Sequence, residues 1–248
     1  MKKILLPTDF SLNAYNAIKY GIQLFHKEKC EFYLLNTYTP ALYNFEYIVS
    51  TNLSIEEVYT KNSEKGLSKV LKRIKKEFPN DKHTYNIIPA FNTLTEEIKF
   101  QVKEKGINFV IMGTQGASRS NKYVIGTQTV HAIKSNICPL LAIPSKFKYT
   151  LPKNILFATD YENFEIQTYL PPLKEIAKKS QATIHILHMI EKAPLKPEQV
   201  DAKNQLISYF KNIPHYFYEL KQETVVKAIN QFRKEKSIDL LAMVGSVI

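Results

Sequence analysis

Three of the seven glycines in this 248-residue chain lie close together, in the stretch GTQGASRSNKYVIGT at residues 113–127. Gly113 and Gly116 follow an apolar run, and Gly126 stands directly before Thr127, where a helix is predicted to begin. Glycine lets the backbone curl around a bound group and present amide donors to it. A helix N-terminus attracts anions through its unpaired amides and its dipole. The spacing predicts a phosphate-binding loop; the alternative is that the glycines only turn a long loop.

The stretch differs from other nucleotide-binding motifs. The chain contains neither the P-loop pattern GxxxxGK[ST] nor the dinucleotide pattern GxGxxG at this place, and no HxGH or SGGxDS sequence typical of nucleotidyl transferases. ATP hydrolysis needs a positioned water and a group that stabilises the transferring charge. Arg119 could supply the second, but no residue presents itself for the first, and no nucleophile elbow is found. A binding or sensing module is favoured, with an interaction scaffold or a slow ATPase as alternatives.

The elements that must position this loop alternate between apolar runs and helical periodicity. Strands are predicted at residues 3–6, 31–37, 84–89, 107–112 and 140–143, and helices at residues 11–25, 54–78, 94–105 and 127–135. Strands that alternate with helices predict an α/β fold with a doubly wound parallel sheet covered on both faces. Ligands of such sheets bind outside the carboxyl ends of the strands, where the strand order reverses.

The ends of two predicted strands carry the residues that would meet there. Pro7, Thr8 and Asp9 end the first strand, and Met112 and Gly113 end the fourth. If the fourth strand pairs with the first, Asp9 faces the glycine loop across the crevice. Capping of the helix that follows is an equally good explanation for Asp9.

The chain repeats itself. KILLPTDF at residues 3–10 returns as NILFATDY at residues 154–161. We therefore predict two tandem doubly wound sheets, in domains spanning residues 1–147 and 148–248. The second copy is shorter and has no counterpart of the glycine loop, the last helix or the last strand. A lost site and a chain that stops early both explain this, and either way one nucleotide site per chain is predicted.

The charge, the apolar runs and the cysteine and histidine content limit which kinds of partner and ligand are expected. The net charge is +11, and residues 1–150 carry 21 Lys+Arg against 12 Asp+Glu, which is +9. The dense basic run at residues 69–76 lies opposite the apolar residues of a predicted helix, which favours a solvated helix face over a nucleic-acid surface. No apolar run has the length of a membrane span, and no signal peptide is recognisable, so a cytoplasmic protein without membrane or nucleic-acid partners is expected. Cys30 and Cys138 predict buried, reduced thiols, and the six histidines show no metal-ligand spacing.

These motifs together resemble those of the universal stress protein family in its tandem two-domain form. The PTD opening, the pattern Gly113-x2-Gly116-x9-Gly126-Thr127 and the sequence CPLLAIP carry the resemblance, which covers residues 1–145 and, more weakly, 151–244. It implies five-stranded parallel sheets of order 3-2-1-4-5 and an adenine nucleotide, ATP or AMP, as ligand. Gln115 departs from the pattern, because many members have histidine there.

The resemblance also implies a site and partners. Gly113, Gly116, Gly126 and Thr127 would hold ribose and phosphates, Pro7, Asp9 and Thr37 would line the adenine side, and Arg119, Gln128 and Thr129 would add phosphate contacts, with Thr8 and Met112 beside them. A divalent ion such as Mg²⁺ would bridge the phosphates. A stress-response or regulatory role is expected, in a homo-oligomer or an internal pseudo-dimer of the two copies.

Overall fold

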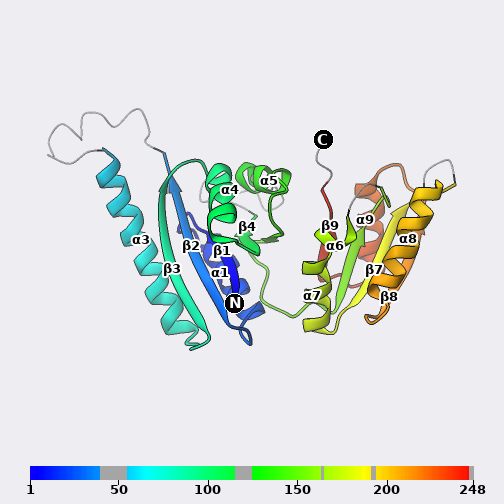
Figure 1. The fold of residues 1–248 in the computed structure, drawn as a ribbon, viewed down its shortest axis with the longest axis horizontal. Coiled ribbons are helices and arrows are strands. Elements are labelled where there is room, and N and C mark those ends of the chain that lie inside the picture. Colours follow the sequence, from blue (N-terminus) through cyan, green and yellow to red (C-terminus); the bar gives the residue numbers. More distant parts are fainter. Residues whose placement is uncertain (40–54, 115–124, 163–164, 191–193, 246–248) are drawn as a thin grey trace. The chain divides into compact units, whose positions relative to one another are not determined.

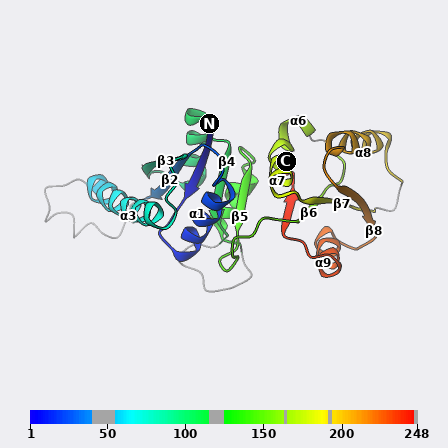
Figure 2. The ribbon, with the colours of Figure 1, turned by 90° about the horizontal axis from the view of Figure 1, so that it is seen from below.

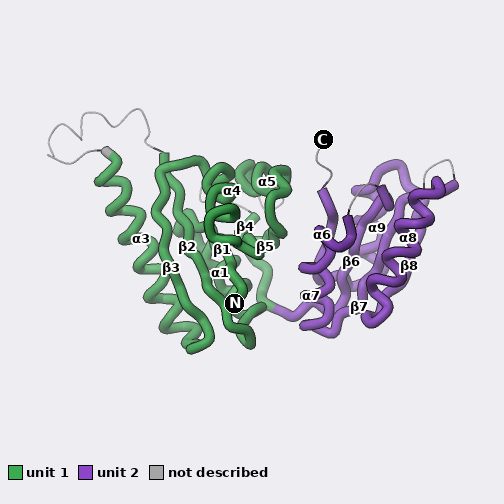
Figure 3. The backbone as a smooth tube through the Cα atoms, in the orientation of Figure 1, with its two compact units in different colours: residues 1–149 green, residues 150–248 purple. Residues whose placement is uncertain are grey.

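The structure, a computed structural model, describes residues 1–39, 55–114, 125–162, 165–190 and 194–245 (Figure 1). The chain divides into two compact units, Met1–Tyr149 and Thr150–Ile248 (Figure 3). Each unit has its own parallel sheet and its own hydrophobic core. None of the helices in the described ranges combines the length and the apolar character that a membrane span requires.

The sheet of the first unit has the predicted strand order. Its strands are β1 (Lys2–Pro7), β2 (Cys30–Tyr38), β3 (His83–Phe91), β4 (Phe109–Gly113) and β5 (Leu140–Ile143). They pair in the order β3-β2-β1-β4-β5, all in parallel. The order reverses between β1 and β4, where Ile4 lies opposite Phe109. The predicted doubly wound fold is therefore confirmed, and its switch point lies beside the end of β1.

Helices cover both faces of this sheet. They are α1 (Leu12–Leu24), α3 (Ile55–Glu77), α4 (Leu94–Lys105) and α5 (Thr127–Lys134). Figure 2 shows α1 and α3 along one face, where the Arg73 guanidinium lies 3.8 Å from the centre of the Tyr15 ring. On the other face, Ile98 of α4 and Ala132 of α5 pack into a core cluster with Leu5 of β1. Because β1 is covered on both faces, its apolar side chains are fully buried.

The second unit repeats the winding with one strand fewer among its described residues. Its strands are β6 (Asn154–Ala158), β7 (Thr183–Met189), β8 (His215–Leu220) and β9 (Leu240–Met243), and its helices are α6 (Ile166–Tyr169), α7 (Pro171–Ser180), α8 (Pro197–Phe210) and α9 (Val225–Glu235). The strands pair in the order β8-β7-β6-β9. This is the order of the first sheet without its fifth strand, as predicted for a shorter second copy. Pro171 and Pro172 separate α6 from α7, because proline opens a helix but cannot continue one.

Neither cysteine is part of a disulfide. Cys30 is buried in β2, as predicted, whereas Cys138 is only partly buried. Burial raises the pKa of the Cys138 thiol to about 12, so the group is a neutral thiol at physiological pH.

Two buried histidines are held neutral by their surroundings. His83 Nε2 donates to the carbonyl of Phe25 at 3.2 Å. His185 Nε2 donates to Asn154 Oδ1 at 3.1 Å, and its Nδ1 accepts from the Tyr218 hydroxyl at 3.2 Å. Burial lowers the pKa of both imidazoles below the ordinary value. The folded chain therefore binds fewer protons at these positions than the unfolded chain does.

Folding stability should consequently fall as the pH is lowered through and below about 6.5, the pKa of histidine in an unfolded chain. In this pH range His83 and His185 become protonated in the unfolded state, whereas in the folded state they become protonated only at a lower pH. Urea unfolding at pH 7.5 and at pH 5.5 measures the loss. In a variant with His83→Gln and His185→Gln the difference between the two pH values should shrink. An undiminished difference in that variant would assign the acid sensitivity to other groups.

Candidate functional site

A cavity of about 530 Å³ opens at the carboxyl ends of the first four strands, beside the switch point between β1 and β4. Ten of the twelve residues that the sequence singles out line it. These are Pro7, Thr8, Asp9, Thr37, Met112, Gly113, Gly126, Thr127, Gln128 and Thr129. The other two, Gly116 and Arg119, lie outside the described residues, as does the rest of the glycine loop at 115–124. The doubly wound topology therefore brings residues from four separate stretches of the sequence to one cavity.

Eight further residues line the same cavity and were not singled out from the sequence. They are Ala14, Leu35, Asn36, Tyr38, Thr39, Asn92, Thr93 and Leu94. Most lie where β2 and β3 end or where α4 begins. They could have been found from their positions at the predicted strand ends, because all the strands of a parallel sheet end at the same edge.

The turn after β1 forms one wall. Thr8 Oγ1 accepts from the amide of Phe10 at 3.0 Å, and Asp9 Oδ1 accepts from the amide of Ser11 at 3.1 Å. Phe10 has a positive φ of 66°. The helix cap itself is Ser11, whose Oγ accepts from the amide of Ala14 at 3.1 Å. Asp9 thus lines the cavity with its carboxylate and also holds the turn that leads into α1, but it is not the N-cap residue.

The second unit builds the same turn without a glycine loop. Thr159 Oγ1 accepts from the amide of Tyr161 at 3.0 Å, and Asp160 Oδ1 accepts from that of Glu162 at 2.9 Å. Tyr161 again has a positive φ, of 61°. Its ring stacks on His188 at 4.7 Å and is 2% exposed. Because both units make these hydrogen bonds, the bonds alone do not indicate a binding site. In the second unit the stacked rings of Tyr161 and His188 lie beside the turn.

A buried hydrogen-bond chain supports the floor of the cavity. Asn36 Nδ2 donates to the carbonyl of Thr8 at 2.8 Å, and Asn36 Oδ1 accepts from Ser63 Oγ at 2.8 Å. In the second unit His188 replaces Asn36 and donates from Nδ1 to the carbonyl of Thr159 at 3.1 Å. In each unit, the carbonyl of the residue that follows the first strand therefore accepts from a side chain of the neighbouring strand.

The N-terminus of α5 forms the opposite wall. Its N-cap residue, Gly126, is buried and has no side chain with which to accept the amides of the first turn. The amide of Gly126 donates to the carbonyl of Thr114, and Thr129 Oγ1 donates to the carbonyl of Gly113 at 2.9 Å. The first turn contains no acidic residue. An anion in this wall would meet the amides of the first helical turn, which no N-cap side chain accepts, and the positive end of the helix dipole.

Gly113 is required by packing as well as by the cavity. A Cβ atom built on Gly113 would lie 2.5 Å from Nδ2 and 2.8 Å from Cγ of Asn13. Asn13 lies on α1 and is buried. The close approach of β4 to α1 therefore depends on a missing side chain, a reason for this glycine that the sequence pattern does not contain.

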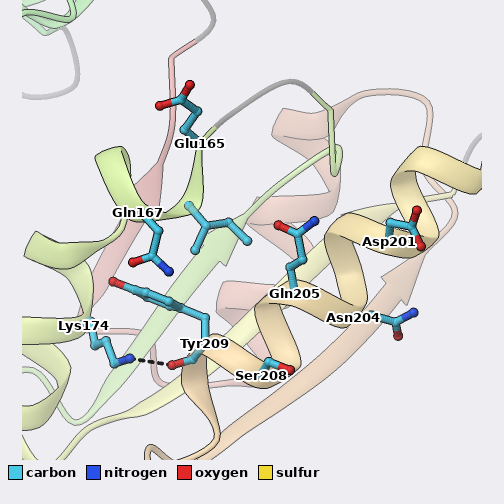
Figure 4. Close-up of a pocket in the computed structure, with 9 residues that line it drawn as sticks. Glu165, Gln167, Lys174, Asp201, Asn204, Gln205, Ser208 and Tyr209 are labelled. Carbon is cyan, nitrogen blue, oxygen red and sulfur yellow. Dashed lines mark hydrogen bonds between the residues drawn. The ribbon is translucent and has the colours of Figure 1, made fainter.

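The second unit has a larger but more open cavity of about 970 Å³, between α6 and α8 (Figure 4). Gln167 and Asp201, which line it, are exposed side chains. Lys174 already donates to the carbonyl of Tyr209 at 2.7 Å and lies 3.9 Å from the centre of that ring. No group of three potential metal ligands occurs among the described residues. The cavity of the first unit is thus the better candidate for a specific small-molecule site.

Comparison with known proteins agrees with this architecture. The model of the universal stress protein family matches residues 1–144. Universal stress protein MJ0577 of Methanocaldococcus jannaschii is 29% identical over 157 residues, which are 58% of this chain and 96% of that protein.

Solved structures extend the likeness over both units. The crystal structure of a universal stress protein from Archaeoglobus fulgidus DSM 4304 covers 99% of this chain and 89% of its own, with a TM-score of 0.72 and 21% identity. The functionally unknown protein PA1789 from Pseudomonas aeruginosa PAO1 covers 98% of this chain and 81% of its own, with a TM-score of 0.61 and 13% identity. At these identities the likeness shows a shared fold.

Proposed function

This chain belongs to the universal stress protein family, and from that premise we propose that its first unit binds one adenine nucleotide, ATP or AMP, in the cavity at the ends of β1 and β4. The observation that carries the proposal is the uncapped N-terminus of α5 facing the turn after β1 across a cavity of about 530 Å³. A nucleotide offers an anionic end for the first and a flat aromatic base with polar edges for the second.

The lining residues divide into two chemical groups. Gly126, Thr127, Gln128 and Thr129 hold the phosphates, because they form the start of α5. Pro7, Thr37 and Met112 present a mixed surface to the base, with Asp9 at its edge. Asp9 is the one carboxylate among the described lining residues, so Mg²⁺ would be held chiefly through the phosphate oxygens. Gly116 and Arg119 are proposed to complete the phosphate side.

The described lining favours binding over turnover. It contains no histidine, lysine, cysteine or glutamate, and Asp9, its one carboxylate, already accepts from the amide of Ser11 in the turn that leads into α1. The protein is accordingly proposed to act as a stress-response or regulatory module that reports nucleotide occupancy. Homo-oligomerisation, for which β5 offers a sheet edge, and a cytoplasmic location stay predictions from the sequence.

Calorimetric titration of the full chain with ATP and with AMP, each with Mg²⁺, tests the proposal. We expect one site with a Kd tighter than about 1 mM, which corresponds to about 4 kcal/mol of binding free energy. Absence of heat at that level would favour the nucleotide-independent scaffold. Steady release of phosphate from ATP in the same samples would favour the slow ATPase.

Gly126→Val should remove this binding without unfolding the protein. The φ of −62° and ψ of 146° at Gly126 lie in the extended region, which valine adopts readily, while its branched side chain would enter the phosphate side of the cavity. The Kd is expected to rise at least tenfold, with an unchanged circular dichroism spectrum. Gly113→Val is not an equivalent test, because its Cβ would lie 2.5 Å from Asn13 Nδ2, so the buried Asn13 side chain would have to move. Full affinity in Gly126→Val would place the phosphates elsewhere.

A further inference from the structure

Five lysines form a single row along the outer face of α3. They are Lys61, Lys65, Lys69, Lys72 and Lys76, here called the lysine stripe, and all five are exposed. At 3.6 residues per turn they occupy about 80° of the helix circumference, and at 1.5 Å per residue the row is about 22 Å long. The opposite side of α3 packs on the sheet and buries Ser63, Leu67 and Ile74. The stripe therefore points directly away from the core.

The five positive charges of the lysine stripe form no ion pair within the described part of the chain. Among the described residues none of the five lysines has an ion-pair partner, and the ion pair that α3 does contain joins Arg73 to Glu77 at 2.6 Å. Lysines four positions apart repel one another and destabilise a helix. A helix face that is only solvated does not require such a row, because interspersed positive and negative charges keep a surface soluble without the repulsion between lysines.

The second unit provides an internal comparison. Its helix α8 connects β7 to β8, as α3 connects β2 to β3, and it also has a solvated face. That face is mixed, with exposed Glu198, Asp201 and Asn204. Its one lysine beyond the N-cap, Lys203, pairs with Glu219 at 2.9 Å. An unneutralised row of lysines is therefore a feature of the first unit and not of the fold.

We propose that the lysine stripe binds the phosphate backbone of a nucleic acid without reading its bases. Lysines four apart rise about 6 Å along the helix, close to the axial rise of two phosphates of one strand, about 3.4 Å each along the axis of a duplex. Ammonium groups on flexible stems contact phosphates as point charges. No large apolar side chain of α3 is exposed in the described structure, so the stripe offers nothing to insert into a bilayer and no ring on which a base could stack. The interpretation of the basic run as a solvated face, favoured from the sequence, is the alternative that the experiment below separates from this proposal.

This surface is distinct from the nucleotide cavity. No residue of α3 lines that cavity. Saturation with ATP should therefore leave nucleic-acid binding unchanged, and the two proposals can fail independently.

The test uses the full chain and a fluorescein-labelled duplex DNA of 20 base pairs and mixed sequence. Anisotropy titrations between 50 and 200 mM NaCl give the slope of log affinity against log salt. Five phosphate contacts predict a slope of about −4.5, since each contributes about 0.9. The variant with Lys65→Gln, Lys69→Gln and Lys72→Gln should lower its magnitude by about 2.7 and weaken binding at 50 mM salt by at least tenfold.

The matched control removes three exposed, unpaired lysines from the second unit. Lys178→Gln, Lys221→Gln and Lys234→Gln make the same change in net charge on surfaces without a row of lysines. The control should keep the wild-type slope. Equal weakening in both triple variants would show that only net charge matters and would overturn the proposal. A Kd above about 100 μM at 50 mM salt, or binding to phosphatidylserine vesicles in preference to DNA, would overturn it as well.

Discussion

Thr127→Glu is expected to raise the Kd for ATP by about 100-fold or more while leaving the protein at least as stable as the wild type. Thr127 is the first residue of α5, is exposed and lines the cavity. A carboxylate in the first turn of a helix is stabilising by about 0.3–1 kcal/mol, because it complements the dipole. The same carboxylate repels a bound phosphate, and two like charges about 4 Å apart at a protein surface repel by about 4 kcal/mol. Folding and binding therefore change in opposite directions.

Thr127→Gln is the matched control, since it has nearly the shape of glutamate without the charge. Calorimetry should give it a Kd much closer to that of the wild type, and thermal unfolding should show no loss of stability in either variant. Comparable affinities for the Glu and Gln variants would mean that no phosphate lies at the start of α5. That result would withdraw the central assignment of the site even if ATP bound elsewhere.

Asn36→Asp is expected to destabilise the first unit by about 3 kcal/mol or more. The amide of Asn36 is buried, donates to the Thr8 carbonyl and accepts from Ser63. Aspartate keeps the shape but replaces the donor with an oxygen that faces a carbonyl. The site must then either bury an unpaired charge or take up a proton, and an uncompensated buried charge costs about 3–5 kcal/mol.

Asn62→Asp makes the same chemical change on the exposed side of α3, one residue from Ser63. Urea unfolding monitored by hydrogen exchange in the first unit should separate the two variants clearly. Because the Asn36 chain supports the turn that lines the cavity, nucleotide affinity should also fall in Asn36→Asp and not in Asn62→Asp. Similar unfolding midpoints for both variants would show that the buried chain contributes little to the fold.

The sequence alone determined the layout of the first unit. Apolar runs and helical periodicity are local properties, so the alternation of strands and helices could be read without knowing any long-range contact. The parallel topology then brings the ends of β1 and β4 together whatever their side chains are, since all the strands of a doubly wound sheet end at one edge. For this reason residues as distant as Pro7 and Thr127 could be assigned to one place from their positions along the strands and helices.

Only the tertiary structure decided how these elements are held and what fills the space beside them. Asn36 meets Ser63 of α3, and Gly113 meets Asn13, across 27 and 100 residues of chain. Such contacts depend on how closely a helix packs on its sheet, which periodicity does not encode. The turns after β1 and β6 also show what periodicity does not encode. Their related sequences make the same hydrogen bonds, but the aromatic rings of the two turns are buried to different extents. Tyr161 of the second unit is buried against His188, whereas Phe10 of the first remains 42% exposed with its ring against Gly66 of α3.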